Sequence, residues 1–135
     1  MKLLYLLSFI VTGFVLYGGP DVTTQNILYH SPSRTDKGSG VITRDLNRIL
    51  IKGKTKLEWQ DGHSAVKYAF EIKSVNGSLS LDKSGEITYQ VTSEKASGRF
   101  IVKKTGAVIK ITAMLAAEGK PLTVDFEIIS YTLLD

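Results

Sequence analysis

The side chains that could carry acid–base or metal chemistry are few and lie far apart in the sequence. His30 and His63 are the only histidines, and cysteine is absent. Neither histidine has a carboxylate at the spacing of a metal site or of a catalytic pair. The chain also lacks the G-x-S-x-G and phosphate-loop motifs. We therefore expect no catalytic residue, no metal site and no cofactor, and a protein that is not an enzyme.

The aromatic residues indicate a different chemistry, the binding of an apolar molecule. They share the uncharged face of the strands predicted below, and two interpretations of that face remain open. It is a filled core whose hydroxyls bond to the backbone, or it lines a small cavity in which Tyr68 and Tyr89 orient a ligand's polar end. The candidate ligand-binding residues are Trp59, Tyr68, Phe70, Tyr89, Phe100 and Phe126.

The stretch Ala65 to Val91 must position several of these rings, and its pattern predicts two successive β-hairpins. Apolar residues alternate with polar ones from Val66 to Ile72, which is typical of a half-buried strand. Asn76-Gly77 and Lys83-Ser84-Gly85 have the residue types of hairpin turns.

A long strand is predicted before this stretch, from Ile49 to Trp59, with its apolar residues at odd positions. Asp61-Gly62 is a strong signal for a two-residue hairpin. Closing the chain on that turn keeps uncharged residues on one face. The predicted pairs are Leu57–Val66, Thr55–Tyr68, Gly53–Phe70 and Ile51–Ile72.

The later turns preserve the same uncharged face. Thr105-Gly106 and Glu118-Gly119 each predict a hairpin. The residues from Thr112 to Glu118 have helix-favouring composition, but the alternation starting at Val108 runs through them and favours a strand. The predicted pairs are Ile72–Leu81, Leu81–Ile87, Leu79–Tyr89, Val102–Ile109, Phe100–Ile111, Leu115–Leu122, Ala113–Val124, Ile111–Phe126 and Ile109–Ile128.

Together these elements predict an all-β domain built as an antiparallel meander of about seven strands. A strand within Val22–His30 and a short strand at Val41–Thr43 would raise the number to eight or nine, with Ser31–Gly40 as a mobile loop between them. One apolar face has to be buried, so the meander either closes into a small up-and-down barrel or folds over as a β-sandwich.

The first residues predict export. Lys2 is followed by an uncharged, largely apolar run of 15 residues, Leu3 to Tyr17. That length suits the core of a signal peptide and is short for a membrane span, although an uncleaved N-terminal anchor is the alternative. We expect a signal peptide at residues 1–19, a single domain at 20–135, and a bacterial periplasmic or extracellular location. Removal of Lys2 leaves 16 basic and 13 acidic side chains, and so small an excess gives no reason to expect nucleic acid as a partner.

An outward apolar patch is the second candidate site. The predicted registers place Ile101, Val108 and Ile129 on the outer face of neighbouring strands. A contiguous patch of this kind would be covered by the N-terminal segment or by a partner. Other outward apolar residues are Leu50, Met114 and Tyr131.

Two stretches resemble the YceI-like family. His63 to Phe70, followed by Gly77 to Asp82, looks like the opening strands of that family, and Ile111 to Leu115, followed by Gly119 to Leu122, is similar to a later strand pair. The family's central arginine-aspartate-histidine segment is missing between them. The resemblance covers under a third of the chain, and it implies an exported, lipocalin-like barrel that holds an isoprenoid lipid.

The sequence therefore leaves two functional hypotheses. The first is an exported small β-barrel that binds an apolar or lipid-like ligand in its interior. The second is a structural or protein-interaction module of the cell envelope with a filled core. The corresponding partners are an apolar small molecule or lipid, and an envelope protein.

Overall fold

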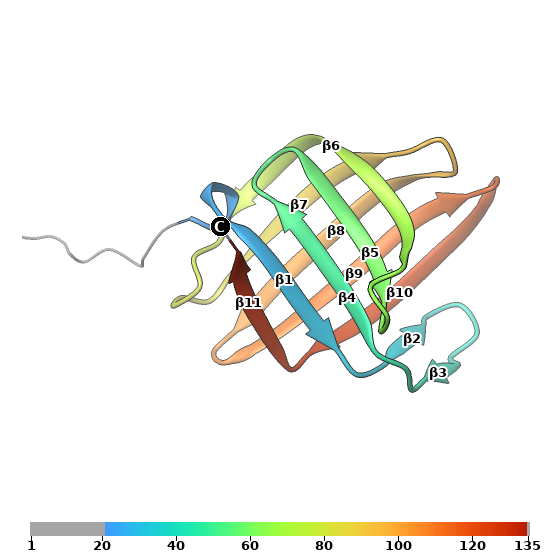
Figure 1. The fold of residues 1–135 in the computed structure, drawn as a ribbon, viewed down its shortest axis with the longest axis horizontal. Helices are drawn as coiled ribbons and strands as arrows, with labels where there is room; N and C mark the ends of the chain where they lie inside the picture. The colour runs from blue at the N-terminus through green and yellow to red at the C-terminus, as the bar shows by residue number, and fades with distance from the viewer. Residues whose placement is uncertain (1–20, 135) are drawn as a thin grey trace, which may run out of the picture.

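The computed structural model describes residues 21–134, which form one antiparallel sheet of eleven strands preceded by a short 3₁₀ turn (Figure 1). The expected signal segment lies outside the described residues. The elements are η2 (Val22–Thr24), β1 (Asn26–Ser31), β2 (Arg34–Asp36), β3 (Ile42–Thr43), β4 (Asn47–Lys52), β5 (Lys56–Asp61), β6 (Val66–Ser78), β7 (Gly85–Thr92), β8 (Ala96–Thr105), β9 (Val108–Ala117), β10 (Lys120–Ile128) and β11 (Ser130–Leu134).

The all-β prediction is confirmed, and the sheet is curled into a half-barrel. Its strand order is β11-β1-β4-β5-β6-β7-β8-β9-β10-β2-β3, so β4 to β10 form a consecutive meander. The total of eleven strands exceeds the expected seven to nine, because the N-terminal residues supply three more strands and β11 follows β10 after one residue. Among residues 21–134, no helix is long and apolar enough to span a membrane.

The curl depends on two strands that pass from one layer of the sheet to the other. β6 pairs with β5 up to Glu71 and with β7 from Glu71 onward, and its register shifts between Ile72 and Ser74. β10 pairs with β9, and after Ile129 the chain continues as β11, which pairs with β1. Bulges and bends at such corners let one continuous sheet enclose a core. Figure 1 shows the result, with β1, β4 and β5 crossing in front of β8, β9 and β10.

The turn predicted at Asn76-Gly77 is wrong, because β6 continues as a strand to Ser78. Gly77 has φ +90°, and a Cβ at this position would lie 2.6 Å from the carbonyl oxygen of Glu86 on β7. Glycine is therefore required by the close approach of two strands rather than by a turn. The chain reverses later, between Ser80 and Lys83, and the pairs that replace the predicted ones are Ile72–Val91, Val75–Tyr89 and Gly77–Ile87.

The two-residue turn predicted at Asp61-Gly62 is also wrong. The backbone N–H of Asp61 donates to the carbonyl of Ala65 at 2.9 Å, and the Asp61 carboxylate accepts from the N–H groups of His63 and Ala65 at 2.8 and 3.0 Å. These bonds stabilise a wider loop. The resulting pairs are Trp59–Tyr68 and Leu57–Phe70, in place of Leu57–Val66, Thr55–Tyr68 and Gly53–Phe70.

The predicted long strand is broken at Gly53, whose φ of +56° reverses the chain between β4 and β5. Ile49 then pairs with Trp59, so both remain on the buried face. At the hairpin predicted at Thr105-Gly106, the register is shifted by two residues, so Val102 pairs with Ile111 instead of Ile109. A shift of two residues leaves every side chain on its original face, because side chains alternate with a period of two.

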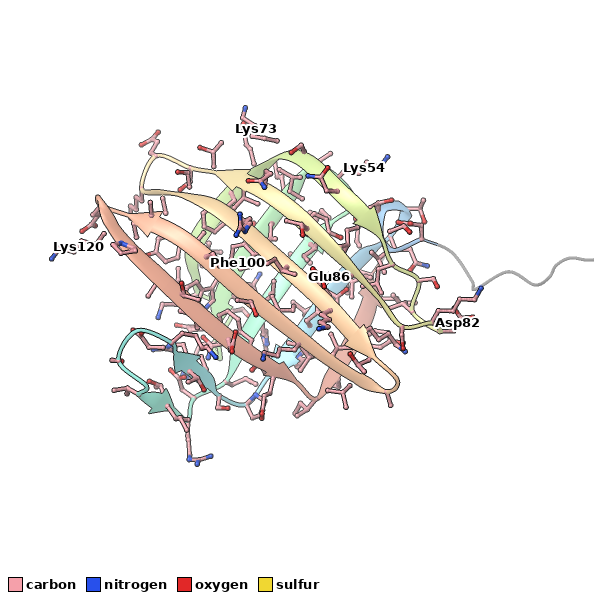
Figure 2. The ribbon with its side chains drawn as sticks, turned by 180° about the vertical axis from the view of Figure 1, so that it is seen from behind. Lys54, Lys73, Asp82, Glu86, Phe100 and Lys120 are labelled. Atoms are coloured by element: carbon pink, nitrogen blue, oxygen red, sulfur yellow. The ribbon has the colours of Figure 1, made fainter. Side chains whose placement is uncertain are left out.

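The β9–β10 register is confirmed at all four predicted pairs: Leu115–Leu122, Ala113–Val124, Ile111–Phe126 and Ile109–Ile128. The strand assignment over Thr112 to Ala117 is confirmed with it. The inward face predicted from the alternation forms a single core cluster that includes Phe70, Phe100 and Phe126. Figure 2 shows Phe100 near the middle of the molecule, between the two layers.

The N-terminal segment departs most from the predictions. Val22 lies in the 3₁₀ turn and is buried, and the strand begins only at Asn26. The segment expected to be a mobile loop contains β2, which pairs with β10 at Asp125 and its neighbours. β3 is found within the predicted Val41–Thr43 strand.

Candidate functional site

A hollow of about 440 Å³ lies at one end of the half-barrel, where β2 and β3 meet β5, β6 and β10. Two of the predicted ligand-binding residues, Trp59 and Tyr68, line it. We call this hollow the mouth. Its lining residues are Arg34, Asp36, Ser39, Val41, Thr43, Trp59, Lys67, Tyr68, Leu122 and Val124.

Trp59 is held in a fixed orientation at the mouth. It lies on β5 between Ile49 on β4 and Tyr68 on β6. Its indole Nε1–H donates to the side-chain oxygen of Asn47 at 2.9 Å, and Asn47 is fully buried. A buried polar group that is hydrogen-bonded in this way adds rigidity, because losing either partner leaves the other unsatisfied.

The predicted aromatic residues form a connected series of ring contacts. The ring centre of Trp59 lies 5.5 Å from that of Tyr68 and 5.1 Å from that of Phe126, with the Phe126 contact edge to face. The series continues from Tyr68 to Phe70 at 5.7 Å and from Phe70 to Phe100 at 5.5 Å. Phe70, Phe100 and Phe126 are buried in this packing, and Tyr89, the cross-strand partner of Phe100, is buried beside it. Only Trp59 and Tyr68 of the six therefore border the mouth.

Lys67 is a mouth residue that the sequence did not single out. Its Nζ lies 5.3 Å from the centre of the Trp59 ring, within the range of a cation–π contact. A second hollow of about 670 Å³ begins on the other side of Lys67 and Tyr68, between the first half of β6 and the β7–β8 turn. Lys67 therefore lies between two openings at the same end of the molecule.

Backbone pairing of β2 with β10 places the β2–β3 segment over the mouth, and ion pairs add to this contact. Arg34 Nη1 lies 2.9 Å from a carboxylate oxygen of Asp45. On the outer face of β10, Asp125 accepts a 2.7 Å hydrogen bond from Thr112, and its other oxygen lies 3.3 Å from Lys37 Nζ. Lys110 Nζ is 3.4 Å from that same oxygen. Burial favours the neutral acid, but the hydrogen bonds and the two lysines outweigh it and lower the pKa of Asp125.

Of the two predicted interior tyrosines, only Tyr89 lies deep in the core. Tyr29 and Tyr89 are the deeply buried tyrosines, whereas Tyr68 is partly exposed at the mouth. The Tyr29 hydroxyl has no hydrogen-bond partner among the described residues. Burial, followed by the nearby Tyr89 and Tyr131 hydroxyls, raises the pKa of Tyr29 far above its usual value. Tyr29 and Asn47 are thus interior polar residues that the sequence did not single out.

The predicted outward patch is not contiguous. Val108 and Ile129 are each 68% exposed and flank the paired Ile109 and Ile128, so they lie close together. Ile101 instead pairs with Thr88 and Thr112, and the charged pair Lys103–Lys110 separates it from Val108. Leu50 and Tyr131 were also expected to face outward, and both predictions are wrong. Leu50 is buried, and Tyr131 pairs with the buried Tyr29 on the inner face.

The histidines take part in surface hydrogen bonding. His30 Nε2 lies 3.2 Å from the Thr132 hydroxyl oxygen, and the His63 backbone N–H caps the Asp61 carboxylate. Within residues 21–134, no group of three or more histidine or acidic side chains is arranged to hold a metal ion. The mouth combines aromatic and aliphatic side chains with two cations, Arg34 and Lys67, and the carboxylate of Asp36.

Comparison of the chain with protein-family models, with curated proteins and with solved structures found no match. The resemblance to the YceI-like family thus has no support beyond the residues that suggested it.

Proposed function

We propose that this protein is an exported, lipocalin-like β-barrel that binds an apolar, lipid-like molecule at its mouth. The observation that carries the proposal is the convergence of apolar side chains from distant parts of the sequence on one hollow. Trp59 and Tyr68 come from β5 and β6, and Leu122 and Val124 come from β10. A volume of about 440 Å³ falls within the usual range for sites that take a small molecule.

The polar groups at the mouth favour a ligand with an anionic end. Lys67 lies beside the Trp59 ring and takes part in none of the ion pairs among the described residues, although it helps the hydrogen bonds from Ala65 and His63 to lower the pKa of Asp61. Arg34 is already paired with Asp45, and Asp36 accepts from the backbone N–H groups of Gly38 and Ser39. Lys67 is therefore the cation best placed to meet a carboxylate or phosphate, while the apolar chain packs on Trp59 and Tyr68.

Export is the second part of the proposal, and it rests on the sequence. Lys2 and the apolar run from Leu3 to Tyr17 have the order and length of a signal peptide. A ligand with a long apolar chain is also one that needs a carrier in an aqueous compartment, because transfer of its hydrocarbon to water is unfavourable.

The test uses Trp59, the only tryptophan of the chain, as a reporter inside the site. Titration with oleate and with methyl oleate should change the Trp59 emission in a saturable way for both ligands, with tighter binding of oleate. Lys67→Ala should remove the preference for oleate and leave the affinity for methyl oleate unchanged. An unchanged Trp59 emission with both ligands would contradict the proposal.

A matched pair of variants localises the binding. Leu122→Asn places a polar amide in the mouth and should weaken both ligands about tenfold, the usual effect of a mismatched group in an apolar pocket. Met114→Asn makes a comparable change on the outer face of β9, where the side chain is exposed. It should leave both affinities unchanged.

The alternative function is a structural or protein-interaction module of the envelope, and the filled interior favours it. Phe100 and Phe126 are completely buried, and their neighbours occupy the space between the layers. Under this alternative the mouth holds only solvent. The titration separates the two functions, because a module of this kind gives no saturable change in Trp59 emission.

A further inference from the structure

β11 lies at one edge of the sheet and begins its strand order. Among residues 21–134, one side of β11 pairs with β1, and the other side has no neighbouring strand. Figure 1 shows it as the last strand of the front layer. The other edge strand, β3, has only two residues. β11 is longer, with five residues, and all five are exposed. Long free edges are sites of strand addition unless charge, proline or a short length protects them.

The backbone direction of β11 follows from its neighbour. The N–H of Gly53 donates to the carbonyl of Gln25 across the β1–β4 pair, so odd-numbered residues of β1 bond to β4 and even-numbered ones bond to β11. The partners of these even-numbered residues on β11 are Ser130, Thr132 and Leu134. The backbone groups of Tyr131 and Leu133 therefore point to the free side.

The side chains of Tyr131 and Leu133 extend the core beyond its covered region. They pair with Tyr29 and Ile27, which are buried, so all four side chains share the inner face of the sheet. Tyr131 is nevertheless 39% exposed and Leu133 is 50% exposed. From Ile129 to Leu134 the sequence carries no charge that would discourage another strand.

We propose that β11 pairs with β11 of a second copy of this chain across a twofold axis at Thr132. This register is the one in which all five residues of β11 are paired. It sets Tyr131 opposite Leu133 of the partner as a hydrogen-bonded pair, with two such pairs related by symmetry. The two Thr132 side chains face each other at a non-hydrogen-bonded position, where cross-strand side chains come closest.

A second copy fits this edge because the edge is complementary to itself. An aromatic ring meets an aliphatic side chain twice, threonine meets threonine, and no charge is buried. The pairing also closes, since each copy uses its one long free edge. It does not depend on the mouth, because β11 contributes no residue to it.

The test is a charge exchange at Thr132, followed by sedimentation velocity over a range of concentrations. The full-length wild-type chain should form dimers. Thr132→Lys and Thr132→Glu should each weaken dimerisation, because like charges then meet on the axis. An equimolar mixture of the two variants should associate about tenfold more tightly than either alone, since each axis then joins opposite charges.

A matched control separates this surface from general effects of charge. Thr88→Lys makes the same change on the outer face of β7, which has strands on both sides. It should dimerise like the wild type. Circular dichroism checks that each variant keeps its strands.

Four outcomes would overturn the proposal. They are a wild-type monomer at all concentrations, open-ended fibres in place of dimers, a mixture no tighter than the single variants, and dimers that persist equally in both Thr132 variants. The last would place the association elsewhere on the chain.

Discussion

The two ends of the half-barrel are covered in different ways. At the end where the described chain begins, Val22 is buried in the core and its N–H donates to the carbonyl of Leu79 at 2.8 Å. At the other end, the β2–β3 segment covers the mouth by pairing of β2 with β10 and by ion pairs of Arg34 and Lys37 with acidic partners. Figure 1 shows η2 and the β2–β3 segment at opposite ends of the molecule.

The contacts that cover the two ends differ in how much they contribute to the stability of the fold. Burial of an apolar side chain such as Val22 contributes directly to folding, at about 1.5–3 kcal/mol for a residue of this kind. Exposed ion pairs contribute about 0–1 kcal/mol each. The first end is therefore held by a buried apolar side chain, although a polar hollow of about 470 Å³ lined by Asp21 and Thr23 lies beside it. The second end is covered by a segment whose side chains contribute mainly exposed contacts and whose backbone pairs with β10. The predictions below test this contrast, beginning with the largest effect.

The core position behind Trp59 should be the most sensitive one. Phe126 is completely buried and contacts the Trp59 ring edge to face. Phe126→Ala should lower the free energy of unfolding by about 3–5 kcal/mol, because it removes that contact and leaves a cavity. Urea unfolding followed by Trp59 emission measures it. A loss below about 1 kcal/mol would show that the core around Phe126 is not tightly packed. As a control, Phe126→Leu should lower the free energy of unfolding clearly less than Phe126→Ala does.

The two ends can be compared with the same substitution at two valines. Val22→Ala, at the η2 end, should lower the free energy of unfolding by about 2 kcal/mol, since a buried side chain loses its contacts. Val41→Ala at the mouth should change stability by less than about 0.5 kcal/mol, because Val41 is 57% exposed. Thermal or urea unfolding of both variants gives the difference. Equal effects would remove the distinction between the ends.

The smallest effect concerns acid. The pKa of Asp125 is lowered in the folded protein, so its contribution is complete above its unfolded pKa of about 4 and is lost as the pH falls through the folded value. Asp125→Asn should therefore cost about 1 kcal/mol at neutral pH and nothing once the acid is protonated. Unfolding measured between neutral pH and about pH 3 tests this. A cost that stays the same throughout would mean that the Lys37 and Lys110 pairs contribute nothing.

The sequence predicted the faces of the strands better than their partners. Phe70, Phe100 and Phe126 were assigned to the inner face and lie there. Their cross-strand partners were correct only where the turn was correct, as at Glu118-Gly119. Gly77 shows why turn signals fail, because a glycine needed for close strand approach has the same sequence appearance as one needed for a turn.

The mouth could be predicted only in part. Trp59 and Tyr68 were named from their place on the apolar face, but the cover over them was not. β2 pairs with β10 about 90 residues later in the chain, and no local pattern specifies a contact of that range. Asn47 was missed for a related reason, since its role depends on the indole of Trp59 across the β4–β5 hairpin.

By itself, the sequence determined that this protein is all-β and most of the side chains that face its core, with Leu50 and Tyr131 as exceptions. That information is local, because alternation with a period of two survives any even shift in register. Only the tertiary structure decided which rings pack into the core and which border the mouth, and that β11 is left with a free edge. Those features depend on where β6 and the β10–β11 segment turn between layers, and such bends come from long-range pairing rather than from the pattern of any one strand.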